Sequence, residues 1–314
     1  MKMLISLALL MPWTVFACLE LGDETPRDHA TRTGGDNRAA QDLRNSMAVS
    51  PRELTAQAKF GEARTEAQKR QAEAVNKIYA GDLEGAIALL KGIEDRSPGQ
   101  HSTAVNLGTA YELKGDNVNA LKWITAGIER NSGSHHGTEW LHILILKAKI
   151  EAAKHPDRPL VSHIVWVPEG MASGSMILVH GENHSAEYIR SALAYQLSER
   201  LVFMKPKDPY VADLLYSYAL IEANLSAVEN GLGLLQLARE YGFPDEDLLK
   251  RQEQRFQSVV QHQRVKSLAL VLLGVVTLML LTDYCRRRKE FFIRCLVHFK
   301  ARRAALTAAA RTAD

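Results

Sequence analysis

Residues 110–124 read AYELKGDNVNALKWI, and residues 76–90, 34 positions earlier, read NKIYAGDLEGAIALL. Both stretches place a glycine, an aspartate and then an alanine between two apolar runs with helical spacing. The glycine can adopt the left-handed conformation that ends a helix, and the aspartate can cap the next helix. Each copy is therefore predicted to be a helix, a tight turn and a second helix. The equivalent pairs are Gly81 and Gly115, Asp82 and Asp116, Ala86 and Ala120, Leu90 and Ile124, and Arg96 and Arg130.

A 34-residue period with this layout resembles the tetratricopeptide repeat (TPR) family. The resemblance is fullest in the second copy, which carries Leu107, Gly108, Tyr111, Ala120 and Ile124. The first copy departs from the family pattern at two positions, Glu73 and Lys77. The resemblance implies an all-α, right-handed solenoid of helical hairpins, and the alternative is a generic pair of hairpins.

In TPR proteins the first helices of successive hairpins line a concave groove that suits an extended peptide or a partner helix. The resemblance therefore implies a protein-binding groove here. Its lining residues would be Gln68, Ala72, Val75, Tyr79, Ser102, Val105, Thr109, Glu112, Glu139, Ile143 and Lys147. The basic residues with which some relatives hold a C-terminal carboxylate are not apparent.

Composition and charge describe two different parts of the chain. The 314 residues are 46% apolar and carry a net charge of +3. Residues 285–314 hold nine Arg or Lys against Glu290 and Asp314, so the remainder has a slight negative balance. We therefore expect no nucleic-acid partner for the main domain. The three cysteines are Cys18, Cys285 and Cys295, which leaves 19–284 without a possible disulfide.

The N-terminus has the pattern of a secretory signal peptide. Lys2 precedes an apolar run, and small residues near Ala17 offer a cleavage site, so residues 1–17 are predicted to be removed. Cys18 leaves a lipid-modified N-terminus open, and an uncleaved anchor is the other alternative.

A second apolar segment, VKSLALVLLGVVTLMLLTDY at 265–284, is long enough to cross a membrane. It is followed at once by CRRRK, and basic flanks stay in the cytoplasm. We therefore expect a single-pass protein of a bacterial inner membrane, with its main domain exported. The basic tail, 285–314, mixes aromatic and cationic residues and can contact an anionic inner leaflet, or can simply set the topology.

The regions between these signals differ in pattern. Residues 18–50 are polar and are predicted to be a disordered leader. The helical repeats occupy 51–154, with Thr138 expected to precede a helix that His155-Pro156 ends. Residues 155–184 interrupt the repeats with two β-type runs, IVWV and SMILV, which predict a hairpin or irregular loops. A degenerate TPR-like helical region follows at 185–262, with a turn at Asn224-Leu225-Ser226.

Motifs of known catalytic sites are missing from the sequence, which has no phosphate-binding loop, no HExxH and no Gly-x-Ser-x-Gly. The most suggestive cluster is His180, Glu182 and His184, which would share one face of an extended segment and could begin a zinc site with His163. The same residues are also ordinary for a loop.

These observations predict a membrane-anchored, TPR-like scaffold or adaptor that is not an enzyme, needs no cofactor and binds envelope proteins. A metal-dependent envelope enzyme that uses the 159–184 insert is the alternative. A purely structural role, in which the chain's own leader fills the groove, is a third possibility.

Overall fold

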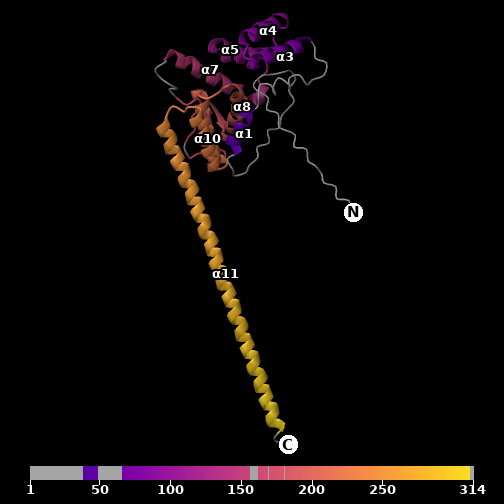
Figure 1. The fold of residues 1–314 in the computed structure, drawn as a ribbon, viewed down its shortest axis with the longest axis vertical. Coiled ribbons are helices and arrows are strands. Elements are labelled where there is room, and N and C mark those ends of the chain that lie inside the picture. Colours follow the sequence, from indigo (N-terminus) through magenta and orange to yellow (C-terminus); the bar gives the residue numbers. More distant parts are fainter. Residues whose placement is uncertain (1–37, 49–65, 156–161, 169, 180, 312–314) are drawn as a thin grey trace, which may run out of the picture. The chain divides into compact units, whose positions relative to one another are not determined.

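The computed structural model describes residues 38–48, 66–155, 162–168, 170–179 and 181–311. The predicted signal peptide, most of the predicted leader, residues 51–65 and His180 lie outside these ranges. The chain divides into two compact units, Met1–Gln257 and Ser258–Asp314. Helices dominate the described part, as predicted, together with one small two-stranded sheet (Figure 1).

The two copies of the repeat form two helical hairpins. The first pairs α3 (Glu66–Tyr79) with α4 (Leu83–Arg96), and the second pairs α5 (His101–Lys114) with α6 (Asn117–Arg130). Both turns follow the predicted chemistry. Gly81 and Gly115 are left-handed, with φ of 80° and 88°. The caps also form, because Asp82 accepts the amide of Gly85 at 3.0 Å and Asp116 accepts that of Asn119 at 3.1 Å.

Small residues let these helices approach closely. Ala86 and Ala120 are completely buried. At Gly108 of α5, an added Cβ would lie 2.5 Å from the Ile124 Cδ1 atom and 3.2 Å from the Ile124 backbone nitrogen. The repeated alanines and glycines are therefore contact points between helices, and a larger side chain there would force the helices apart.

Helix α7 (Glu139–Lys154) packs on α6 and ends where the sequence predicts, just before His155-Pro156. A 3-10 turn, η1 (Ser134–Gly137), precedes it. His135 and His136 in this turn have φ of 48° and 57°, a conformation that residues with a Cβ rarely adopt.

The insert forms a hairpin, but with a different strand pairing from the one expected. Strand β1 (Met176–Val179) pairs antiparallel with β2 (Glu182–Ser185), so MILV pairs with ENHS and not with IVWV. The IVWV run is irregular because side chains of another helix satisfy its backbone: Asp213 accepts the amide of Ile164 at 2.7 Å, and Ser217 donates to the carbonyl of Val165 at 2.8 Å.

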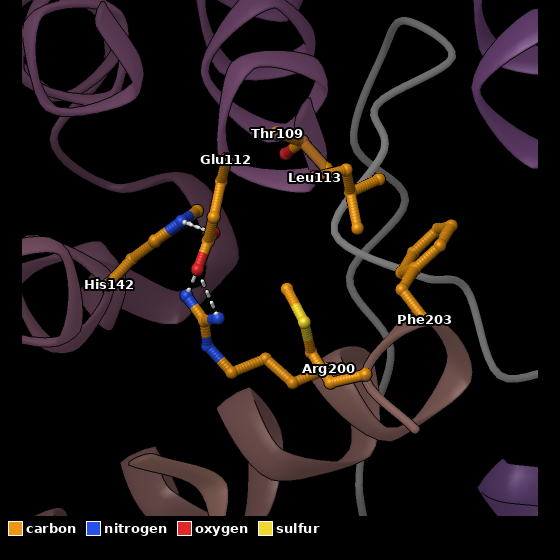
Figure 2. A pocket seen from close by; sticks show the side chains of 7 residues that line it. Thr109, Glu112, Leu113, His142, Arg200 and Phe203 are labelled. Carbon is orange, nitrogen blue, oxygen red and sulfur yellow. Dashed lines mark hydrogen bonds and ion pairs between the residues drawn. The ribbon is translucent and has the colours of Figure 1, made fainter. Parts of the chain in front are cut away.

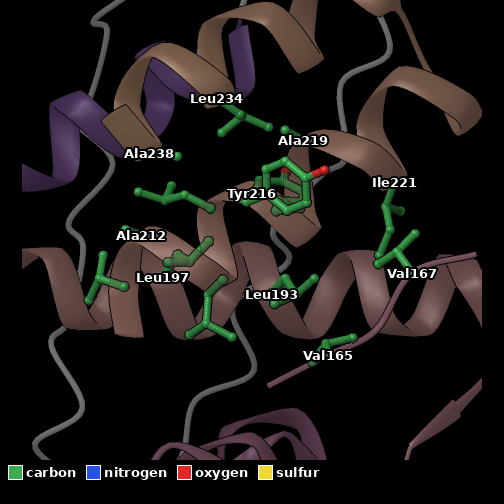
Figure 3. Packing of buried hydrophobic residues seen from close by; sticks show 14 of the residues in the cluster. Val165, Val167, Leu193, Leu197, Ala212, Tyr216, Ala219, Ile221, Leu234 and Ala238 are labelled. Atoms are coloured by element: carbon green, nitrogen blue, oxygen red, sulfur yellow. The ribbon is translucent and has the colours of Figure 1, made fainter. Parts of the chain in front are cut away.

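Three further helices follow, α8 (Ala186–Phe203), α9 (Pro209–Leu225) and α10 (Val228–Glu240). Helices α9 and α10 form a hairpin whose turn lies close to the predicted one. Their contact is tight at Gly231, where a Cβ would lie 2.8 Å from that of Ala223. The largest hydrophobic core of the first unit gathers on these helices, and Val165 and Val167 of the insert join it (Figure 3).

One segment of the predicted disordered leader is a helix. Residues Arg38–Ala48 form α1, which packs against α8 and α10 with Ala40 and Leu43 buried. An 11-residue helix is marginal alone and depends on tertiary packing. Its short apolar pattern is therefore a weak signal, and the prediction of disorder is wrong for these residues.

Helix α11 (Glu246–Arg311) begins in the first unit, where Phe256 is buried, and continues through the second. Among the described residues it is the one helix long and apolar enough to cross a membrane. Its most apolar window has a mean hydropathy of 2.3, and none of that window is buried. The predicted span, 265–284, lies within it.

Candidate functional site

The most unusual feature of the first unit is a cluster of charged side chains in its interior. Helix α5 contributes Glu112, α7 contributes Glu139, His142 and Lys149, and α8 contributes Arg200. The side chains of Glu112, His142 and Arg200 are each no more than 3% exposed. Charged side chains are almost never buried to this extent unless they are paired.

Glu112 is at the centre of the cluster (Figure 2). One carboxylate oxygen accepts Arg200 Nη1 at 2.9 Å and Lys149 Nζ at 2.8 Å, and the other faces His142 Nε2 at 2.6 Å. Burial raises the pKa of the Glu112 carboxyl, but Arg200, His142 and Lys149 outweigh burial and hold the pKa well below its ordinary value. Glu112 is therefore ionised at neutral pH.

A second buried carboxylate continues the cluster toward the strained turn. Glu139 bonds His135 Nδ1, and its other oxygen lies 3.3 Å from His142 Nδ1. Burial raises the pKa of Glu139, but the lowering by the two histidines is larger. The pKa therefore stays well below its ordinary range. The left-handed backbone at His135 is thus held in place by contacts of its own side chain.

Helix α8 reaches this cluster with two side chains one turn apart. Arg200 bonds Glu112, and Gln196 donates to the Thr138 hydroxyl at 3.1 Å. The Thr138 hydroxyl in turn donates to the carbonyl of His135 at 2.6 Å. Residues four apart lie on the same face of a helix, so one face of α8 is bonded to both α5 and the start of α7.

A small pocket adjoins the cluster, lined by Thr109, Glu112, Leu113, His142, Arg200, Phe203 and Met204 (Figure 2). Among the described residues, the buried hydroxyl of Thr109 has no hydrogen-bond partner. Both oxygens of Glu112 are already occupied, so this carboxylate has no free position from which to act on a substrate.

Nearly half of the predicted groove positions are not available to a partner. Five of its lining residues are buried: Val75, Val105, Thr109, Glu112 and Glu139. Ring stacking shows the cause at one end, where Tyr79 of α3 lies on Phe203 of α8 with ring centroids 5.3 Å apart. The end of α8 therefore lies against Tyr79 and Glu112, near the C-terminal ends of α3 and α5, and the prediction of an open groove is wrong at this end.

The remaining groove positions are Gln68 and Lys147, which are exposed, and Ala72, Ser102 and Ile143, which are half-buried. The sequence could not indicate α8 as the occupant, because Glu112 and Arg200 are 88 positions apart. The sequence did contain one indication of a buried polar contact. Glu112 and His142 stand on otherwise apolar helix faces, and such side chains need partners in the interior.

The histidine candidates for a metal site are separated. His163 donates its Nδ1–H to the Asp213 carboxylate at 2.6 Å and stacks on Tyr216. His184 stacks on Trp140 and lies 3.7 Å from Glu182. His180 lies outside the described residues. Within the described part of the chain, no group of three or more His, Cys, Asp or Glu side chains is placed to hold a metal ion.

Comparison with known proteins adds no relative to this picture. No protein-family model matches the chain, and neither a curated protein nor a solved structure is significantly similar to it.

Proposed function

We propose that this protein is a membrane-anchored, TPR-like scaffold that binds protein partners on the exported side of a bacterial inner membrane, with its C-terminus in the cytoplasm. Two helical hairpins at a 34-residue interval, each with a left-handed glycine and an aspartate cap, support the TPR-like architecture. The long apolar helix supports the anchor.

The observation that carries this proposal is a set of exposed apolar side chains on the insert. Trp166, Met176 and Leu178 are 63%, 53% and 61% exposed. Large apolar side chains that are exposed on one segment often mark a site that another molecule covers. Tryptophan in particular is enriched among the residues that dominate binding energy.

Strand β1 makes the same point in its alternation. Ile177 and Val179 are buried, so the opposite face of the strand meets solvent. A strand with one solvated face ordinarily carries polar residues there, whereas β1 carries Met176 and Leu178. The insert, and not the partly buried groove, is therefore the proposed partner-binding surface.

The buried charged cluster has a structural role in this proposal. Both oxygens of Glu112 are held by Arg200, Lys149 and His142, and the geometry of the cluster holds α8 against α5 and α7. A catalytic carboxylate needs access to the substrate proton. The cluster thus supports a rigid scaffold more than an enzyme.

The proposal is tested by cross-linking the full-length protein in its native cells and identifying the captured proteins. The working variant is Trp166→Asp with Leu178→Asp. The matched control is Val118→Asp, because Val118 is 67% exposed on α6 of the repeat region.

We expect an envelope protein that is captured with the wild type and the Val118 variant but is lost with the insert variant. Equal capture by all three chains would reject the insert as the binding surface. Loss with Val118→Asp alone would move the surface to the hairpins.

A further inference from the structure

Beyond the apolar span, the second unit carries another set of exposed apolar side chains. They lie between residues 285 and 302, are between 46% and 68% exposed, and comprise Phe291, Phe292, Ile293, Leu296, Val297 and Phe299. Phenylalanine side chains that stay exposed to water do not stabilise a helix by burial. Three of them on one isolated helix therefore indicate that another surface covers them.

Three of these residues, Phe292, Leu296 and Phe299, form a stripe along the helix, and Phe291, Ile293 and Val297 lie outside it. Phe292, Cys295, Leu296 and Phe299 follow the spacing i, i+3, i+4 and i+7, which places them on one face. Lys300 and Arg302 flank this stripe at its far end. Long basic side chains beside an apolar stripe can lay their stems on apolar surface and keep their charges in a polar layer.

The charge of this segment indicates what kind of surface covers the Phe292–Phe299 stripe. Residues 285–302 contain seven Arg or Lys and one Glu, a net charge of +6. Basic residues near an anionic bilayer surface are each attracted to it, and this segment is continuous with the span. We propose that residues 285–302 lie on the anionic phospholipid headgroups of the leaflet at the C-terminal end of the span, with the Phe292–Phe299 stripe inserted among them.

Pairing with a second copy of the chain fits less well. A coiled coil needs apolar residues at both seam positions through three or four heptads. The stripe covers only 292–299, and the seam positions before and after it are occupied by Arg288 or Lys289 and by Arg302 or Arg303.

Contact with the leaflet requires the helix to turn from the axis of the span. In the structure α11 is continuous through this region. Thr282, near the end of the span, already donates its hydroxyl to the carbonyl of Met279 at 2.8 Å. Bonds of this kind from Ser or Thr often bend helices, so the turn is placed near Thr282.

This inference rests on the membrane anchor of the proposed function but not on its protein partners. The test uses the full-length chain with Cys18→Ser and Cys285→Ser, and a nitroxide label on the native Cys295. The control is Cys295→Ser with Ala301→Cys, because residue 301 lies on the opposite face of the helix and is exposed. Both proteins are reconstituted into vesicles of phosphatidylcholine alone or with one quarter phosphatidylglycerol.

Accessibility of each label to oxygen and to a water-soluble nickel complex is measured by power-saturation electron paramagnetic resonance. We expect Cys295 to lose nickel accessibility in the anionic vesicles, with position 301 remaining accessible. High salt should restore much of the nickel accessibility of Cys295, because exposed charges are screened.

Equal nickel accessibility at both positions in both vesicle types would overturn the inference. Protection of Cys295 in neutral vesicles, with broadening between labels, would overturn it in favour of a second copy. Flotation of the protein with both vesicle types separates these outcomes from failure of the anchor itself, because a chain without a span would not float.

Discussion

The two hairpins α3–α6 and the region built by α7 and α8 are stabilised in different ways. The hairpins depend on neighbouring residues: a left-handed glycine, an aspartate cap three positions before the amide that it accepts, and an alanine at the crossing. The α7–α8 region depends on charges that meet from distant parts of the chain, as in the Glu112–Arg200 pair. Interactions between near neighbours stabilise the hairpins, whereas a buried cluster of charges holds the α7–α8 region together.

This difference has a consequence for substitutions. A buried ion pair adds little net stability relative to apolar residues, but removing one partner leaves an uncompensated charge in the interior. A change at a turn or helix crossing of the hairpins affects one turn or one contact. A change in the cluster, whose Glu112 lies on α5, affects three helices together. Substitutions in the cluster are therefore expected to have the largest effects.

The largest effect is expected from Glu112→Gln. It leaves Arg200 and Lys149 without their carboxylate, so the free energy of unfolding should fall by about 3–5 kcal/mol. Urea unfolding of the full-length protein in detergent, followed by tryptophan fluorescence, measures this. The control is Glu84→Gln, because Glu84 pairs with Lys114 at the surface and should leave the midpoint unchanged. Equal midpoints for the two variants would show that the cluster does not hold the region together.

A substitution within the hairpins, Gly108→Ala, is expected to have an intermediate effect. The new Cβ would press on the backbone nitrogen of Ile124, and overpacking of this kind costs about 1–3 kcal/mol. Gly92→Ala in α4 is the matched control, since its nearest atom lies at 3.5 Å on the flexible side chain of Arg96. That variant should gain about 0.5–1 kcal/mol, because alanine favours a helix. Stabilisation by both substitutions would contradict the close packing of α5 on α6.

Gly115→Ala should have a smaller effect that is confined to one turn. An alanine in the left-handed conformation costs about 1–2 kcal/mol, and Gly115 has a φ of 88°. Gly133 has an ordinary φ of −84°, so Gly133→Ala should be close to neutral. The two midpoints are compared in the same urea titration, and a neutral Gly115→Ala would mean that the turn can be built in another way.

Acid should weaken the two regions gradually and unequally. The cluster cations hold the pKa of Glu112 below its ordinary value against the opposing effect of burial, so its stabilising contribution is complete above that ordinary value of 4.5. The contribution is then lost as the pH falls toward the lower folded pKa. The hydrogen bond from Lys77 also lowers the pKa of Asp82, but Asp82 is at the surface. Amide exchange, corrected for intrinsic rates, should therefore accelerate in α7 and α8 before α3 and α4 once the pH falls below 4.5, and should change little between pH 7 and 4.5. Earlier exchange in α3 and α4 would reverse this assignment.

The sequence predicted well the elements that depend on near neighbours. Gly81, Gly115 and their aspartates marked two turns, and His155-Pro156 marked the end of α7. The apolar run at 265–284 identified the segment that is long enough to cross a membrane. In each case the physical cause lies within a few residues, where backbone conformation, capping and hydropathy can be assessed directly.

The sequence did not predict the burial of the groove positions, the strand pairing or α1, because these depend on residues that are remote in the chain. Val75 and Thr109 occupy positions at which a groove was expected, yet both are buried. The IVWV run has the composition of a strand, but Asp213 and Ser217 satisfy its backbone without a partner strand. Helix α1 is short and depends on packing against α8 and α10.

What the sequence determined by itself is thus a set of helices, their turns and one apolar span, because each follows from local conformational preference and hydropathy. The tertiary structure decided which faces remain open. From the sequence, Glu112 could line a binding surface or be buried. It is buried because the fold places Arg200, 88 positions away in the chain, beside it. A buried charge needs a partner of opposite sign, and the fold alone determines where that partner comes from.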